Sequence, residues 1–376
     1  MDGEDDNVSY FYEDDYLNGS EAIVILEEFQ SPDGGGGAFR IFLVAAYSVI
    51  CCLGILGNGL VIFVAAFQVK KTVNTIWFVN LAVADLLFNL FLPFHIAYVA
   101  LGYHWAFGTA LCKLSNFLLH HNMHTSVFLL VAISVDRCVA VVLPVWSQNH
   151  RSVRLVCAAC VAIWALASLL SVPSLVFRDT VLVHGKVVCF SNFSLAEAAA
   201  TPGGPGHPHP GSPPPGARWH LAVGALRFLC GFLIPVVAIT ACYVTIVCKL
   251  RRNRLARTRK PFRVILSIIV TFFLCWCPYQ TLCLLELRHS AVPAAVFTLG
   301  LPLATVLAIG NSCMNPILYA FMGQDFKKFR VAFFSRLANA LSEDAGQSPD
   351  HSHRNSTRMS SVNERSSRIE KETGMF

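Results

Sequence analysis

The sequence predicts an all-α membrane protein, a seven-transmembrane helix bundle with a C-terminal amphipathic helix on the inner leaflet. Of its 376 residues, 55% are hydrophobic and only 14% are charged, a composition that suits lipid better than water. The chain also holds seven apolar runs of the length that a bilayer requires, about 20 residues. Lys and Arg gather on alternate connections between these runs, as they do on the cytoplasmic side of membrane proteins.

The seven runs define a predicted bundle over residues 40–322. The spans are roughly 41–67, 75–99, 109–135, 154–175, 226–248, 264–285 and 296–321. Prolines interrupt five of them and remove backbone hydrogen bonds, so we expect kinks at which helix segments can pivot. These residues are Pro93, Pro173, Pro235, Pro278 and Pro316.

The two faces of the predicted bundle differ in charge. Residues 1–37 carry eleven Asp or Glu and no Lys or Arg, whereas eight basic residues lie between Lys249 and Arg263. Because cytoplasmic loops retain positive charge, we expect a multi-pass protein of the plasma membrane with its N-terminus outside. The acidic tail, 1–39, is predicted to be disordered and to attract a cationic partner. Its first residues do not resemble a cleavable signal, so the first span is expected to direct insertion.

The second outer connection, about 176–225, is the longest in the chain. Within it, segment 201–217 has twelve Pro or Gly among seventeen residues, which predicts a disordered insertion that cannot pack a core. The segment before it, 181–190, has β-branched runs on both sides of His-Gly and predicts a hairpin.

The region after the seventh span is predicted to lie inside the cell. Over 323–341, Phe and Leu recur at helical spacing opposite Lys and Arg, which predicts a basic amphipathic helix against membrane lipid. The remaining tail, 342–376, is predicted to be disordered and to be phosphorylated. The predicted phosphorylation sites are hydroxyl side chains of this tail: Ser356, Thr357, Ser360, Ser361, Ser366 and Ser367.

The fourteen cysteines do not form a disulfide framework. Twelve of them lie within or beside the spans, where thiols behave as small buried hydrophobic groups. Cys112, at the outer start of the third span, and Cys189, in the second outer loop, are the two on the oxidising side. We therefore predict that they form a disulfide that pins this loop over the mouth of the bundle.

Glycosylation is predicted from Asn-X-Ser/Thr sequons on the outer side. Asn7, Asn18 and Asn192 meet this condition. Asn355 also lies in a sequon, but the predicted topology places it inside the cell and excludes it.

Asp85 is the clearest functional residue within the spans, because a charge in the middle of a bilayer costs about 2.5–3.5 kcal/mol on insertion scales. Four polar residues, each pair one helical turn apart, could converge on it: Asn122 and Ser126 in the third span, Asn311 and Asn315 in the seventh. A carboxylate with neutral oxygens suits a hard cation such as sodium. A buried hydrogen-bond network without an ion is an equal alternative. Either arrangement would join three helices and could have two states, as a switch requires.

Six short motifs lie in the correct spans and order to resemble the rhodopsin-like G-protein-coupled receptors. They are GN at 57–58, LAVAD ending at Asp85, DRC at 136–138, Trp164, CWCP at 275–278 and NPILY at 315–319. Cys138 departs from the tyrosine that most of the family carries, a variant found among chemoattractant receptors. Arg137 on its own could be a cation that reaches for the membrane interface beside Asp136.

The resemblance implies a role for each matching residue. Arg137 would leave Asp136 and meet the G protein, and Asp85 with its neighbours would be a sodium site. Trp276, followed by Pro278, would lie beneath the ligand. Tyr243 and Tyr319 would stabilise the active state.

The ligand pocket is predicted from the outer halves of the spans. Leu119 stands where amine receptors carry an aspartate, which argues against an amine ligand. Arg227 and Arg178 instead offer guanidinium groups suited to a carboxylate, although Arg227 could also reach for the membrane surface. Glu286 and Asn116 would orient the backbone or amine of a peptide.

Longer stretches, such as GYHWAFGTALCKLSNFLLHHNM and MGQDFKKFRVAFFSRLANALSED, are similar to receptors for chemoattractant peptides. This resemblance implies a non-enzymatic receptor whose partners are a peptide, an inhibitory G protein, arrestin, receptor kinases and lipid, with no nucleic acid and no cofactor beyond sodium. A transporter or proton pump is the competing class, but the seventh span has no lysine for a chromophore. A scavenging receptor without G-protein signalling is a further alternative.

Overall fold

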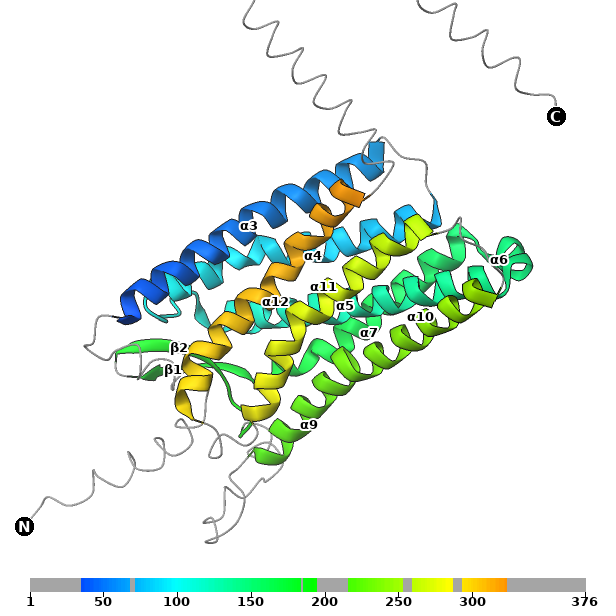
Figure 1. Ribbon diagram of the computed structural model, residues 1–376. Coiled ribbons are helices and arrows are strands. Elements are labelled where there is room, and N and C mark those ends of the chain that lie inside the picture. Colours follow the sequence, from blue (N-terminus) through cyan, green and yellow to red (C-terminus); the bar gives the residue numbers. More distant parts are fainter. Residues whose placement is uncertain are drawn as a thin grey trace, which may run out of the picture. The chain divides into compact units, whose positions relative to one another are not determined.

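A computed structural model describes residues 35–67, 72–183, 185–194, 216–252, 259–286 and 293–322, which belong to one compact unit. In this part of the chain, seven helices are long and apolar enough to cross a membrane, which confirms the predicted bundle (Figure 1). The spans are α3 (Gly35–Phe67), α4 (Val73–Ala100), α5 (Gly108–Val142), α7 (Val153–Phe177), the continuous α9 (Ala217–Phe228), η1 (Leu229–Leu233) and α10 (Ile234–Arg252), α11 (Arg259–Glu286) and α12 (Ala294–Met322).

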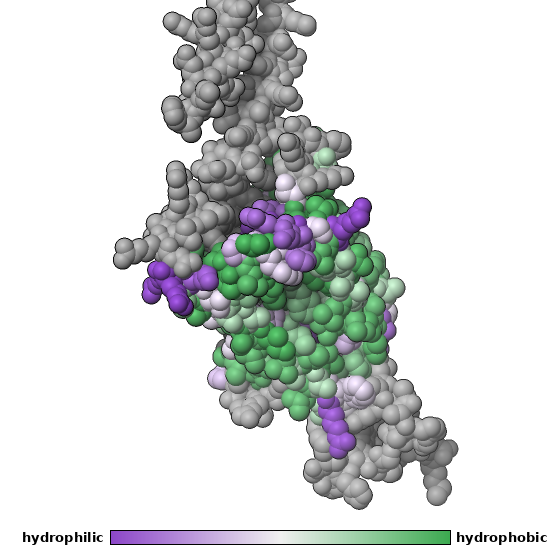
Figure 2. Space-filling view, turned by 90° about the vertical axis from the view of Figure 1, so that its right-hand side faces the viewer, coloured by the Kyte–Doolittle hydropathy of each residue, from purple (hydrophilic) through white to green (hydrophobic). Residues whose placement is uncertain are grey.

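Hydrophobic side chains cover the outside of the bundle. Leu56, Val161 and Leu274 are each about 70% exposed, whereas a water-soluble protein would bury most such residues. In Figure 2, hydrophobic residues fill the middle of the visible face and hydrophilic residues gather towards its ends. This distribution is that of a helix bundle surrounded by lipid.

Helix α5 occupies the centre of the bundle and contacts α4, α7, α10 and α11. On its other side, α3 packs between α4 and α12, and α12 packs against α11. The largest core cluster includes Trp77, Leu129, Phe272 and Trp276, from three different helices. Residues along α5 are therefore placed to contact four of the other spans.

Two helix starts correct the predicted boundaries. Helix α3 begins at Gly35, within the predicted tail 1–39, and α9 begins at Ala217, the last residue of the predicted insertion 201–217. Arg218 and His220 lower the local hydropathy, so the apolar run begins later than the helix does. The π-helical turn η1 was also not predicted.

Two short elements lie at opposite ends of the bundle (Figure 1). Strands β1 (Arg178–Val183) and β2 (Lys186–Ser191) form an antiparallel hairpin, which confirms the hairpin expected from 181–190. The Trp105 amide N–H donates to the Val187 carbonyl at 2.7 Å and fastens the hairpin to the connection between α4 and α5. Helix α6 (Pro144–His150), at the other end, was not predicted.

Four of the predicted prolines, Pro93, Pro173, Pro278 and Pro316, lie inside helices. Pro235 follows η1 as the second residue of α10. Gly57 allows α3 to approach α12 closely, because a Cβ atom built on it would lie 2.9 Å from Pro316 Cβ. The glycine of the GN motif is therefore a packing requirement.

Several predicted features lie outside the described residues. They are most of the acidic tail with Asn7 and Asn18, most of the insertion, the amphipathic helix at 323–341 and the tail phosphorylation sites. Asn192 is described: it follows β2, and its side-chain Oδ1 accepts a hydrogen bond from the Ser194 hydroxyl of its sequon at 2.5 Å. Its glycosylation stays a prediction.

Candidate functional site

The Cys112–Cys189 disulfide is present, as predicted, and joins the first turns of α5 to β2. The two sulfurs pack with Trp105 in a small apolar cluster. Because Cys189 lies in the hairpin, this bond holds the hairpin directly over the end of α5. The hairpin thus becomes a fixed wall of the site.

Arg178 and Asn116 both contact Cys189. The Arg178 guanidinium donates to the Cys189 carbonyl at 3.4 Å, and Asn116 Nδ2 lies 4.0 Å from Cys189 Sγ. Arg178 is the first residue of β1 and Asn116 lies on α5, two turns from the start of the helix. The structure therefore brings two of the predicted ligand residues to one point beneath the hairpin.

Arg227 reaches the same region from α9. Its NH2 group donates to Ser174 Oγ on α7 at 3.1 Å, and Ser174 Oγ lies 3.1 Å from His120 Nδ1 on α5. The same His120 nitrogen lies 2.9 Å from the carbonyl oxygen of Asn116. Hydrogen bonds thus connect Arg227 to Asn116, although sequence reasoning had missed Ser174 and His120.

Glu286, the fourth predicted ligand residue, is the last residue of α11 and is half-buried. Its role in the site stays a prediction.

The predicted activation residues of α11 lie in the middle of the bundle. Trp276 is buried, and its ring lies 6.1 Å from that of Phe272 and 5.9 Å from that of Tyr279. Pro278 follows on the same helix, half-buried. Two residues further, Gln280 Nε2 donates to Met123 Sδ at 3.0 Å, which joins α11 to α5. A shift of α11 would therefore displace side chains of α5.

Asp85 is fully buried on α4 and meets the predicted partners. Asn315 Nδ2 on α12 donates to its Oδ2 atom at 2.8 Å, and Asn122 on α5 lies close enough to interact with the carboxyl group. Ser126 Oγ donates to Asn122 Oδ1 at 3.4 Å. The other carboxyl oxygen of Asp85 has no hydrogen-bond partner among the described residues. The predicted cluster thus joins three helices and leaves one acceptor open.

Three further residues extend this cluster. Asn89 Nδ2, one turn along α4, donates to Ser312 Oγ at 2.9 Å, and Asn58 Nδ2 on α3 donates to the Ser312 carbonyl at 2.8 Å. Asn311, which was predicted, is buried beside Ser312 on α12. Asn58 belongs to the GN motif, so a signal for it was present, but its partner could not be inferred from spacing.

Asp136 is shared by two arginines at the end of the bundle that carries α6. Arg137 NH2 lies 3.3 Å from Asp136 Oδ2, whereas Arg151 binds both oxygens, with Nε at 2.7 Å from Oδ1 and NH2 at 2.9 Å from Oδ2. Both arginines also donate to Asn74 Oδ1 on α4. The sequence placed Asp136 beside Arg137 but gave no sign that Arg151 is the closer partner.

Tyr243 on α10 lies near this cluster. Its hydroxyl oxygen and Arg137 Nε are both buried without a hydrogen-bond partner among the described residues, and the two side chains are within electrostatic range. Tyr319 lies within α12, but its side chain is outside the described part.

Comparison with known proteins identifies this arrangement. Residues 57–319 match the family described as 7 transmembrane receptor (rhodopsin family). The chain belongs to this family. As the predicted resemblance implied, it is a receptor and not an enzyme.

Relatives within the receptor family are similar over most of the chain. Chemerin-like receptor 1 of Sus scrofa is 65% identical over 97% of this receptor and 99% of its own length. Chemerin-like receptor 2 of Mus musculus is 38% identical over 79% of this receptor and 80% of its own length. The C3a anaphylatoxin chemotactic receptor of Oncorhynchus mykiss is 39% identical over 85% of this receptor and 84% of its own length. The expected likeness to chemoattractant receptors is confirmed.

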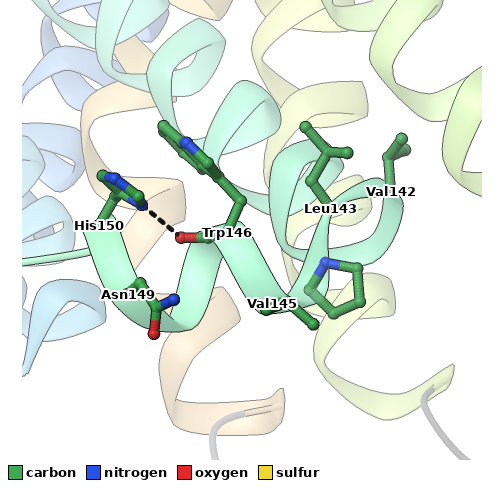
Figure 3. Close-up of a pocket in the computed structure, with 7 residues that line it drawn as sticks. Val142, Leu143, Val145, Trp146, Asn149 and His150 are labelled. Atoms are coloured by element: carbon green, nitrogen blue, oxygen red, sulfur yellow. Dashed lines mark hydrogen bonds between the residues drawn. The ribbon is translucent and has the colours of Figure 1, made fainter.

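The receptor presents an apolar face on α6, beside the Asp136 cluster. Figure 3 shows a hollow there, lined by Val142, Leu143, Pro144, Val145, Trp146, Asn149 and His150. The rings of Trp146 and His150 stack with centroids 4.5 Å apart, and His150 Nδ1 lies 3.0 Å from the Trp146 carbonyl oxygen. Val145 remains 72% exposed. This face is available to a partner that meets the receptor at the α6 end.

Proposed function

We propose that the chain is a G-protein-coupled receptor for chemerin, which it binds through the C-terminal peptide of that ligand. In this proposal the receptor signals through inhibitory G proteins and recruits arrestin after receptor kinases act on its tail. The observation that carries the proposal is the convergence of Arg178, Arg227 and Asn116 beneath the disulfide-held hairpin. The names of the chemerin-like relatives support the choice of ligand.

The hairpin end is assigned to the outside of the plasma membrane. The opposite end carries Arg137 and Arg151, and the last turn of α10 adds Lys249, Arg251 and Arg252. Basic residues concentrate on the cytoplasmic side of membrane proteins. A disulfide at the hairpin end agrees with an oxidising extracellular environment.

A peptide that ends in a free carboxylate matches the chemistry of the outer site. Guanidinium groups bind carboxylates through charge-assisted hydrogen bonds, and two such groups reach this region from different elements. Arg227 is half-buried, so a bound carboxylate would be partly removed from water and the contact would be strengthened. The acidic tail would act earlier, by attracting the cationic part of the ligand, and salt should screen that effect.

The test is a double-change cycle on ligand and receptor. The affinities of a C-terminal chemerin peptide and of its C-terminal amide are measured on the wild type and on Arg227→Ala. Each single change should cost about 2–5 kcal/mol, because it leaves one charge without its partner. The two changes together should cost clearly less than their sum, because they remove the same contact.

Arg218→Ala is the matched control, since it removes the same charge from an exposed position of the same helix. It should leave the preference for the acid unchanged. Strict additivity between amidation and Arg227→Ala would place the carboxylate elsewhere, and Arg178 would then be tested in the same cycle.

The α6 end supports the proposed coupling to a G protein and arrestin. It combines Arg137, which can exchange Asp136 for another partner, with the exposed apolar residues Val145 and Trp146. A partner helix with an apolar face could pack on such a surface. Tyr243 lies within reach to stabilise Arg137 once it leaves Asp136.

Sodium is proposed as an allosteric ion at Asp85. The donor set fits a hard cation, because it joins one carboxylate to neutral oxygens of Ser126 and Asn122, and because Asp85 Oδ1 has no hydrogen-bond partner among the described residues. When bound, the ion would supply positive charge that stabilises this buried carboxylate. A fully hydrogen-bonded arrangement without an ion is the alternative.

A different chemoattractant peptide is the second candidate ligand. The relative described as a C3a anaphylatoxin chemotactic receptor favours a complement fragment, and a formyl peptide belongs to the same comparison. Applying each peptide to cells that express the receptor, and measuring which one lowers cyclic AMP, separates these ligands. Binding of a peptide without any signal would identify a scavenging receptor instead.

A further inference from the structure

Three helices meet in a polar layer around Ser174. Its Oγ atom accepts a hydrogen bond from the NH2 group of Arg227 on α9 and lies 3.1 Å from His120 Nδ1 on α5. Ser174 and His120 are each at least 98% buried. A hydroxyl group in such a place has few alternative partners, so its contacts fix the side chains around it.

The direction of these hydrogen bonds follows from the partners. The Asn116 carbonyl, 2.9 Å from His120 Nδ1, can only accept, so this ring nitrogen carries the proton. The Arg227 guanidinium can only donate. The one Nδ1 proton of His120 is shared between the Asn116 carbonyl and Ser174 Oγ in a three-centre bond. Ser174 Oγ therefore accepts from His120 and from Arg227, and His120 holds it in place while it holds Arg227.

A second layer lies one turn deeper and repeats the pattern without the arginine. His124 Nδ1 on α5 lies 3.2 Å from Ser171 Oγ on α7, and Ser171 donates its own proton to the Ala167 carbonyl at 2.7 Å. Gly231 in η1 stands where the upper layer has its arginine: a Cβ atom built on it would lie 3.5 Å from His124 Nε2. Ser174 thus contacts Arg227, whereas Ser171 bonds to a carbonyl of its own helix.

We infer that Ser174 and His120 are positioning residues that hold the Arg227 guanidinium in the orientation that receives the carboxylate of a peptide ligand. This inference rests on the proposed role of Arg227. A long arginine side chain has many rotamers, and a ligand that must order it loses affinity. Because Ser174 and His120 already order the arginine side chain, the ligand does not lose affinity by ordering it. Neither residue needs to contact the ligand itself.

The experiment compares the affinities of the acid and amide forms of a C-terminal chemerin peptide on membranes that contain the full-length receptor. Ser174→Ala should lower the affinity for the acid about tenfold, the effect of one hydrogen bond to a charged group, and leave the affinity for the amide unchanged. His120→Leu should do the same. His120→Asn should retain the preference for the acid, because its amide N–H₂ can replace Nδ1–H.

Ser171→Ala is the matched control, since it removes a buried hydroxyl from the same helix and from an equivalent histidine. It should leave the preference for the acid intact. The number of binding sites for the amide at saturation reports how much receptor is folded in every variant.

The inference is overturned if Ser174→Ala keeps the wild-type preference for the acid, or if Ser171→Ala loses as much of it. In either case, loss of the preference in Arg227→Ala would leave the proposed carboxylate site standing. If Arg227→Ala itself keeps the full preference, both the site and the inference are wrong.

Discussion

Replacing Arg151 by alanine should make the receptor harder to activate. Arg151 takes both oxygens of Asp136, at 2.7 and 2.9 Å, and leaves Arg137 a longer contact of 3.3 Å. The two guanidinium groups also share Asn74 Oδ1, so their like charges oppose each other. Without Arg151, the carboxylate would bind Arg137 alone, and Arg137 would leave it less readily to meet a G protein.

The size of this effect follows from the exposure of the pair. The side chains of Arg151 and Asp136 are 29% and 11% exposed, so solvent screens their interaction. Ion pairs of this kind contribute up to about 1 kcal/mol. A shift of that size in the equilibrium between inactive and active states corresponds to a roughly fivefold higher agonist concentration for half-maximal signalling.

The assay is inhibition of cyclic AMP across a range of agonist concentrations, with basal signalling measured in the same cells. Arg154→Ala is the control, because it removes an exposed basic residue from the first turn of α7. Asp136→Asn should act in the opposite direction and raise basal signalling, because it weakens both ion pairs. Raised basal signalling in Arg151→Ala would refute the competition between the two arginines, as would an unchanged agonist response.

Three further predictions concern the disulfide, the polar cluster and the coupling residue. The Cys112–Cys189 bond spans 77 residues of sequence, so Cys112→Ala or Cys189→Ala should cost about 4–5 kcal/mol of stability. The loss is measured as reduced surface expression and ligand binding, and normal binding by both variants would contradict the prediction. Raising sodium should weaken agonist binding, and Asp85→Asn should abolish that response; a response that survives the substitution would favour a network without an ion. Arg137→Ala should bind peptide normally and fail to activate G protein in a nucleotide-exchange assay, and intact signalling would contradict its proposed role.

The sequence predicted the spans and the hairpin because both depend on local patterns. Apolar runs indicate contact with lipid directly, and β-branched residues on both sides of Gly185 indicate two strands joined by a tight turn. In the structure Gly185 has a φ of 77°. The same method placed the start of α9 too late, because the helix continues past the apolar run through Arg218. Hydropathy measures the solvent around a helix and not its length.

Most of the site depends on contacts between distant parts of the chain. Arg151 is separated from Asp136 by an unpredicted helix, and its sequence position indicated only a basic loop. Ser174 and His120 look like ordinary small or polar residues of apolar spans until α9 brings Arg227 against them. Asp85 could be predicted because a buried carboxylate is costly wherever it lies, and helical spacing then indicated its amide and hydroxyl neighbours on the third and seventh spans. Asn89 and Ser312, which extend the cluster, carry no such signal.

Cyclic AMP in cells that express this receptor is the most direct test of its proposed function. The cells are stimulated with a C-terminal chemerin peptide, with and without pertussis toxin. We predict that the peptide lowers cyclic AMP in a concentration-dependent way and that the toxin abolishes the effect. Unchanged cyclic AMP in cells that display the receptor and bind the peptide, or a response that the toxin does not affect, would contradict signalling through inhibitory G proteins.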